Sequence, residues 1–114
     1  MAEKQFAVTG YVVNLARNIQ AVWQDAATKK ASASIEVYGD DARLIVYFVD
    51  SVAELGRCAY LPEQKVAVSF VLMEQLPYYL KLLESEGVMA CLNSEQPEQN
   101  GLFMSVDCSS RVNA

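Results

Sequence analysis

The sequence contains no histidine, and its three cysteines do not form a metal-binding pattern. Histidine is the commonest general base and a frequent metal ligand, so its absence removes the usual basis for acid–base catalysis and for metal binding. Cys58, Cys91 and Cys108 are odd in number and share no C-x-x-C spacing, which argues against a tetrahedral zinc site and a disulfide framework. We therefore expect no metal, no cofactor and three reduced thiols, as in a cytoplasmic protein.

Glycine and basic residues are also scarce. The 5 glycines are widely separated, and neither G-x-x-x-x-G-K-S/T nor G-x-G-x-x-G occurs, which excludes the usual glycine-rich nucleotide-binding loops. The 9 Lys and Arg residues are outnumbered by 14 Asp and Glu residues, and Lys29-Lys30 is the only adjacent basic pair. Because nucleic-acid binding needs clustered positive charge, we expect no nucleic-acid partner.

Long apolar runs are absent as well. The longest uninterrupted run, Leu44 to Val49, is far shorter than the roughly 20 residues that a membrane-spanning helix needs. The first residues show no apolar stretch behind a basic segment, so no signal peptide is expected. The sequence therefore predicts a protein with no membrane partner.

Apolar residues, by contrast, make up 53% of the chain, and its mean hydropathy is +0.11. A chain of 114 residues fits a single domain over 1–114, and the surface of so small a domain is large relative to its core. Some apolar side chains should therefore lie on the surface, where a partner can cover them. Because twofold interfaces are the commonest, we predict a symmetric homodimer.

The clearest local pattern predicts a helix over residues 76–86. Four residues recur at the spacing i, i+3, i+4, i+7 that places them on one helical face: Leu76, Tyr79, Leu80 and Leu83. Pro77 suits a first helical turn, and Gly87 suits the left-handed conformation that ends a helix.

Residues 15–29 fit two patterns. Leu15 and Ile19 lie on one helical face, no glycine or proline interrupts the segment, and its composition favours a helix, so we predict a second helix there. The residues around Ala21 also alternate as in a half-buried strand. In that alternative, two strands are joined by a loop over residues 25–30.

Alternating apolar residues predict strands in the rest of the chain, near residues 5–13, 33–37, 44–48, 66–72, 88–93 and 102–108. Gly39-Asp40 suits a two-residue hairpin turn, which would set Glu36 opposite Arg43. In the last strand Met104 is expected to face inward. Together with the two predicted helices, these strands give an α+β fold, an antiparallel sheet of about five or six strands with the helices packed on it.

Tyrosine and arginine residues indicate a binding surface, because both are enriched where proteins bind other molecules. Five of them fall on predicted strands or on the connection over residues 50–64: Tyr38, Arg43, Tyr47, Arg57 and Tyr60. On the predicted helix, Tyr78 and Leu82 lie opposite the core-facing residues, so we predict an oligomer contact there.

From these patterns we expect a non-catalytic binding or interaction module, which takes a protein segment or a small apolar ligand on an aromatic sheet face or groove. The alternative is a small enzyme or enzyme subunit, with a pocket lined by Tyr and Arg and with Asp50 as its base. Cys58 follows Arg57, but the sequence provides no partner base for a nucleophilic thiol. Asp40 and Asp41 fit a turn better than a metal site.

Overall fold

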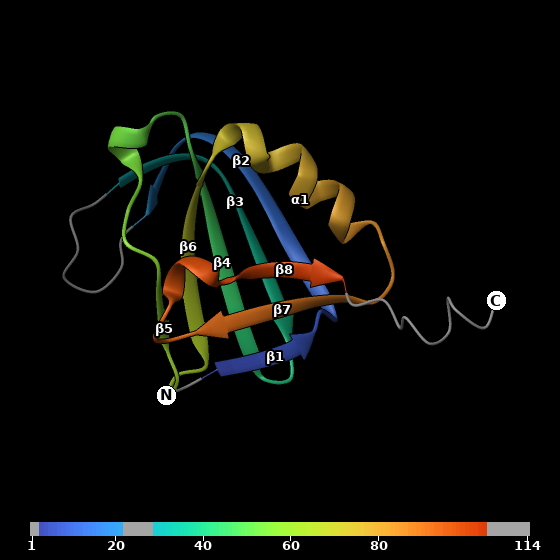
Figure 1. Ribbon diagram of the computed structural model, residues 1–114. Coiled ribbons are helices and arrows are strands. Elements are labelled where there is room, and N and C mark those ends of the chain that lie inside the picture. The colour runs from blue at the N-terminus through green and yellow to red at the C-terminus, as the bar shows by residue number, and fades with distance from the viewer. Residues whose placement is uncertain (1–2, 22–28, 105–114) are drawn as a thin grey trace.

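The computed structural model describes residues 3–21 and 29–104, which form two β-sheets and one α-helix (Figure 1). The large sheet has the order β2-β3-β4-β6-β5, with β2 (Gly10–Ala21), β3 (Lys29–Gly39), β4 (Ala42–Val49), β6 (Val66–Leu72) and β5 (Ala59–Leu61). The small sheet has the order β1-β7-β8, with β1 (Glu3–Ala7), β7 (Val88–Asn93) and β8 (Gly101–Met104). The helix is α1 (Leu76–Leu83), and the short 3₁₀ turns are η1 (Val52–Glu54), η2 (Met73–Gln75) and η3 (Pro97–Gln99).

This sheet-rich architecture lies within the predicted α+β class, but the prediction of one antiparallel sheet is wrong. The strands form two sheets, and the large one is mixed because β4 and β6 run parallel, with Leu44 beside Ala67. The other neighbouring strands run antiparallel. Parallel neighbours need a long crossover between them, and the connection after β4 supplies it.

The second helix, predicted over residues 15–29, is wrong. Residues 15–21 belong instead to β2, as the alternative of two strands expected, and Lys29 already belongs to β3; residues 22–28 lie outside the described residues. From Leu15 to Ile19, β2 advances four residues while β3 advances two, so the pairing is irregular there. Leu15 and Ile19 are four residues apart, a spacing that also places two residues on one face of a helix. The loop expected over 25–30 in the alternative lies partly outside the described residues.

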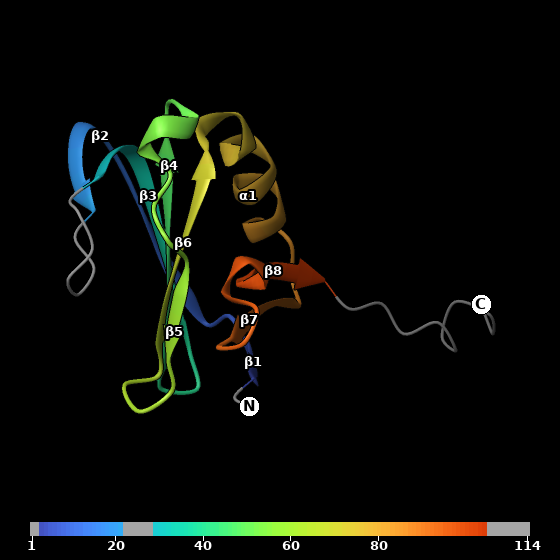
Figure 2. The same cartoon turned by 60° about the vertical axis from the view of Figure 1, so that its left-hand side comes forward.

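The main hydrophobic core lies between the large sheet and a second layer formed by α1 and the small sheet. Figure 2 shows α1 and the small sheet on the same side of the large sheet. Alternate residues of β3 and β4 point into this core and are fully buried: Ala33, Ile35, Val37, Leu44, Val46 and Phe48. The second layer contributes Phe6, Leu76, Leu83, Val88, Ala90 and Leu92. We call this side of the large sheet its inner face.

The helix predicted from the spacing of apolar residues is confirmed as α1, although it is shorter than expected. Leu76 and Leu83 are buried in the main core. The ring of Tyr79 meets the ring of Phe48 edge-on, with centroids 5.2 Å apart. Gly87 has a φ of 82°, so it takes the left-handed conformation predicted after the helix.

The hairpin predicted between β3 and β4 is confirmed, but its turn lies one residue later than expected, at Asp40-Asp41. Both residues have positive φ values, 49° and 60°, as a tight hairpin turn of type I′ requires, and aspartate tolerates this conformation. Arg43 therefore lies opposite Tyr38 and not opposite Glu36. A shift of two positions keeps every side chain on its predicted face.

Gly39 is needed for a close approach between strands and not for the turn. A Cβ atom on Gly39 would collide with the carbonyl oxygen of Ala7 and with the ring of Phe6. The end of β1 therefore lies directly against the end of β3, where only glycine fits. Lys4 and Asp40 join the same two segments through an ion pair of 2.6 Å.

The connection over residues 50–65 returns the chain from the end of β4 to the start of β6, and part of it covers the outer face of the large sheet. Leu55 packs in a second apolar cluster with Val68 and Phe70. A Cβ atom on Gly56 would collide with the Phe70 ring, so the backbone lies directly on that ring. The chain then forms β5, which pairs antiparallel with β6.

The second predicted hairpin is confirmed as β7 and β8. Met104 pairs with the buried Val88 and so lies on the predicted inward side, but it is 43% exposed because β8 is an edge strand of the small sheet. The rest of the predicted strand, 105–108, lies outside the described residues. The buried Asn100 side chain donates to the Ala59 carbonyl oxygen at 2.9 Å and accepts from the Asn93 N–H at 2.7 Å, which fastens this hairpin to β5.

Replacing Gly39 with alanine should destabilise the protein by about 1–3 kcal/mol, because the added methyl group must displace the backbone of β1. Gly10→Ala is the matched control, because a Cβ atom there would lie at an ordinary contact distance of 3.9 Å from the Tyr38 ring. Its effect should stay within about 0.5 kcal/mol. Urea unfolding measures both, and equal free energies of unfolding for the two variants would contradict the close approach.

Leu83→Ala should lower the free energy of unfolding by about 2–5 kcal/mol, because it removes a buried side chain and leaves a cavity between α1 and the sheet. Tyr78→Ala changes the same helix at a residue that is 70% exposed, and it should change that free energy by less than about 0.5 kcal/mol. Denaturant titrations of both variants measure the difference. A Leu83→Ala protein as stable as the Tyr78→Ala protein would mean that α1 does not pack as described.

Candidate functional site

Three of the residues predicted to bind a partner lie on the outer face of the large sheet, opposite the main core. Tyr38 stands directly across from Arg43 in the pairing of β3 with β4. Tyr47 shares this face with Arg43, because alternate residues of a strand point the same way. The Tyr47 ring stacks on Phe70 of β6, with centroids 5.3 Å apart and an angle of 29° between the rings. The three side chains thus form an aromatic surface beside the second apolar cluster.

Charge on this outer face is balanced by a local ion pair. Arg43 Nη1 lies 2.9 Å from Glu36 Oε1. Burial raises the pKa of the Tyr47 hydroxyl, the nearby Glu36 carboxylate raises it further, and Arg43 opposes the rise. Tyr47 therefore keeps its proton at neutral pH and offers a hydrogen-bond donor beside the ion pair.

The other two predicted binding residues lie elsewhere. Tyr60 in β5 stands opposite Ala67, on the inner face, and it is buried in the main core. Arg57 is exposed on the connection that precedes β5. The structure thus brings together Tyr38, Arg43 and Tyr47, and it separates Arg57 and Tyr60 from them.

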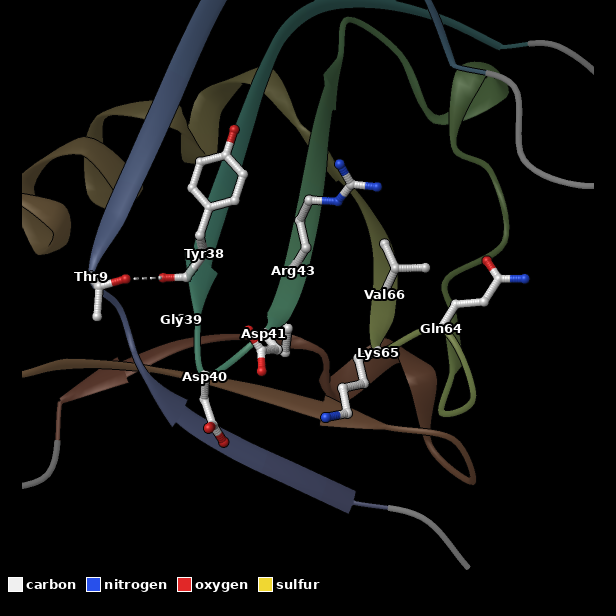
Figure 3. Close-up of a pocket in the computed structure, with 10 residues that line it drawn as sticks. Thr9, Tyr38, Gly39, Asp40, Asp41, Arg43, Gln64, Lys65 and Val66 are labelled. Atoms are coloured by element: carbon white, nitrogen blue, oxygen red, sulfur yellow. Dashed lines mark hydrogen bonds between the residues drawn. The ribbon is translucent and has the colours of Figure 1, made fainter.

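An open pocket of about 560 Å³ lies where the β3–β4 turn approaches the start of β6 (Figure 3). Figure 3 shows Tyr38 and Arg43 side by side on neighbouring strands, with Lys65 just before the start of β6. The Thr9 hydroxyl donates to the Tyr38 carbonyl oxygen at 3.3 Å. The pocket is thus lined by tyrosine and arginine, as the enzyme alternative requires.

Two of the charged groups that line this pocket, Asp40 and Arg43, have ion-pair partners in Lys4 and Glu36. The hydrogen bond and the charge of Lys4 hold the pKa of the Asp40 carboxyl below its usual value. Asp50, the base in the enzyme alternative, lies just beyond the opposite end of β4 and accepts a hydrogen bond of 2.6 Å from the Ser32 hydroxyl. Within residues 3–21 and 29–104 no three side chains are grouped as metal ligands. This pocket offers polar contacts without an assembled pair of acid and base.

The two residues predicted as an oligomer contact differ in exposure. Tyr78 projects from α1 and is 70% exposed, whereas Leu82 packs partly against the main core. Both line a small groove of about 170 Å³ with Tyr79 and Leu102, between α1 and β8. Leu82 is thus partly covered by the second hairpin, and the oligomer contact predicted on α1 stays a prediction.

A candidate site that the sequence analysis did not identify lies along β2. This strand ends the large sheet, so its outer edge is unpaired among the described residues. Three apolar or aromatic side chains are exposed on it: Tyr11 (45%), Val12 (42%) and Leu15 (69%). No charged residue occurs from Gly10 to Ala16. A long edge without charge is open to pairing with another strand.

The signal for this edge was present in the sequence as the alternation of residues around Tyr11. The helix predicted over residues 15–29 hid it, because it ended the first strand before Leu15 and assigned that residue to a helical core face. Only the pairing with β3 shows that Tyr11 and Leu15 belong to one strand, where they share a side.

The free energy of unfolding should fall as the pH rises above about 10, because Tyr47 binds its proton more tightly in the folded than in the unfolded chain. This contribution is complete below the unfolded pKa and is lost as the pH rises through the folded pKa. Tyr47→Phe removes it and should flatten the decline relative to the wild type. Urea unfolding at a series of pH values measures the slopes, and equal slopes for Tyr47→Phe and the wild type would contradict the burial of this hydroxyl.

Comparison with known proteins gives no function for this chain, so a function must be inferred from the geometry of the structure. No protein-family model, curated protein or solved structure matches the chain. None of the helices in the described part of the chain is long and apolar enough to cross a membrane.

Proposed function

We propose that this chain is a cytoplasmic interaction module that binds an extended protein segment as an additional strand beside β2. The observation that carries the proposal is the unpaired outer edge of β2 with Tyr11, Val12 and Leu15 exposed along it. A bound strand would satisfy the outward backbone groups and cover side chains on both faces. The free thiols of Cys58 and Cys91 suit a reducing compartment.

The other sheet edges in the described part of the chain are less open to such pairing. β5 has only 3 residues and is followed by Pro62. β1 carries the charged Glu3 and Lys4, and β8 has only 4 residues. Short length, proline and charge are the usual features that block an edge, and β2, with 12 residues, has none of them before Arg17.

The side chains of β2 indicate what the bound segment should contain. Tyr11 and Leu15 project on the inner face, so apolar residues at alternate positions of the segment would cover them. On the outer face, Gly10 lies opposite Tyr38 and has no side chain. A long side chain of the segment can therefore reach Tyr38 across Gly10, which gives the predicted aromatic face its role beside the edge.

A short fluorescein-labelled peptide of alternating valine and threonine should bind the protein, and Leu15→Lys should weaken binding at least tenfold, or about 1.4 kcal/mol. The physical reason is that a charged side chain replaces apolar surface that the peptide would cover. Val52→Lys makes the same change on an equally exposed residue outside β2, 71% against 69%, and should leave the affinity unchanged. Fluorescence anisotropy measures all three dissociation constants.

Methylation of the peptide's backbone nitrogens separates strand pairing from apolar adhesion. The N–H groups of one alternate set of residues point toward β2, and those of the other set point away. Methylating the first set should abolish binding, and methylating the second should preserve it. Two methylated peptides that bind as well as the parent, or a monomeric protein that does not bind the parent, would refute strand addition.

A further inference from the structure

We infer that a second copy of this chain occupies the edge of β2, with the two β2 strands antiparallel about a twofold axis at Val13. This inference rests on the proposed function, since it names the partner that the edge takes. It also gives the predicted homodimer a defined interface. The argument depends on which residues such an axis would bring together.

Symmetry restricts the possible registers. An axis that relates two antiparallel neighbouring strands stands perpendicular to the sheet, so it keeps the inner faces of both copies on one side. Directly opposed residues of neighbouring strands also point to one side. The inner face of β2 carries Tyr11, Val13 and Leu15. Each of them must therefore lie opposite an inner-face residue of β2 in the second copy. Some residue of β2 must therefore lie opposite itself.

The register at Val13 best matches the exposed side chains. It places Tyr11, which is 45% exposed, opposite Leu15 of the second copy, which is 69% exposed, and the symmetric contact repeats the match. An axis at Val12 would leave Leu15 opposite Thr9, and an axis at Asn14 would set Tyr11 opposite Arg17. Of these three registers, only the one at Val13 covers both exposed inner-face residues with apolar surface.

Charge favours the same surface for self-association. The chain has a net charge of −5, so two copies repel each other over most arrangements. A twofold axis brings like residues near each other, and from Gly10 to Ala16 there is no charged residue to be repelled.

Sedimentation velocity on the full chain tests the association. The wild type should sediment as a species of twice the 12.6 kDa chain mass at micromolar concentration. Leu15→Lys should weaken the dimer at least tenfold, and Val52→Lys should leave it intact. Circular dichroism of both variants shows whether each remains folded. A wild-type monomer, or a folded Leu15→Lys dimer as strong as the wild type, would overturn the inference.

Cysteine cross-linking tests the register in a protein whose natural cysteines are replaced by serine. Residues opposite themselves across antiparallel strands come close enough for a disulfide. Val13→Cys should therefore form a disulfide-linked dimer on mild oxidation, and Val12→Cys and Asn14→Cys should form far less. Dominant cross-linking at Val12 or Asn14 would overturn the register at Val13.

Failure of this inference can be told apart from failure of the proposed function. The protein could stay monomeric and still bind the valine–threonine peptide, with binding lost only when the first set of nitrogens is methylated. Such a protein uses the edge of β2 for another partner. In that case self-association is overturned and strand addition stands. A dimer that neither Leu15→Lys nor the peptide disturbs forms through another surface, which overturns self-association at β2. If that protein also fails to bind the peptide, strand addition is overturned as well.

Discussion

The parallel pairing of β4 with β6 is the constraint on which the rest of this structure depends. Arg43, near the start of β4, lies beside Val66 at the start of β6, so the chain must travel back along the whole of β4 before it can pair again. A strand of this length spans roughly 25 Å, and no tight turn can make that return. Residues 50–65 therefore cross the outer face, where Leu55 and Gly56 cover Phe70.

That return path gives the two sides and two edges of the large sheet different properties. Near β6 the outer face becomes a second apolar cluster, whereas over β3 and β4 it stays open around Tyr38 and Arg43. At one edge the returning chain adds β5, which is short. At the other edge nothing in the described part of the chain covers β2, so backbone groups and apolar side chains there are available to a partner.

Local patterns in the sequence predicted those elements whose residues face a single core. The helix after Leu76 and the hairpin of β3 and β4 both follow from periodic apolar residues, and a shift of the turn to Asp40-Asp41 left the faces unchanged. The segment after Leu15 was predicted as a helix, with strands as the alternative, and the helix is wrong because pairing with β3 overrides the helical preference of its residues. The parallel pairing and the burial of Tyr60 depend on contacts between distant segments, which no local pattern records.

The position of β1 has a consequence for the order in which the protein folds. Glu3 pairs with Asn93, so the first described strand has no partner in its sheet until β7, some 90 residues later, has been synthesised. Contacts between such distant segments are slow to form because a long loop must close first. During synthesis the large sheet and α1 can therefore assemble before the small sheet. The close contact of Ala7 with Gly39 then allows β1 to pack against the β3–β4 hairpin before β7 has formed.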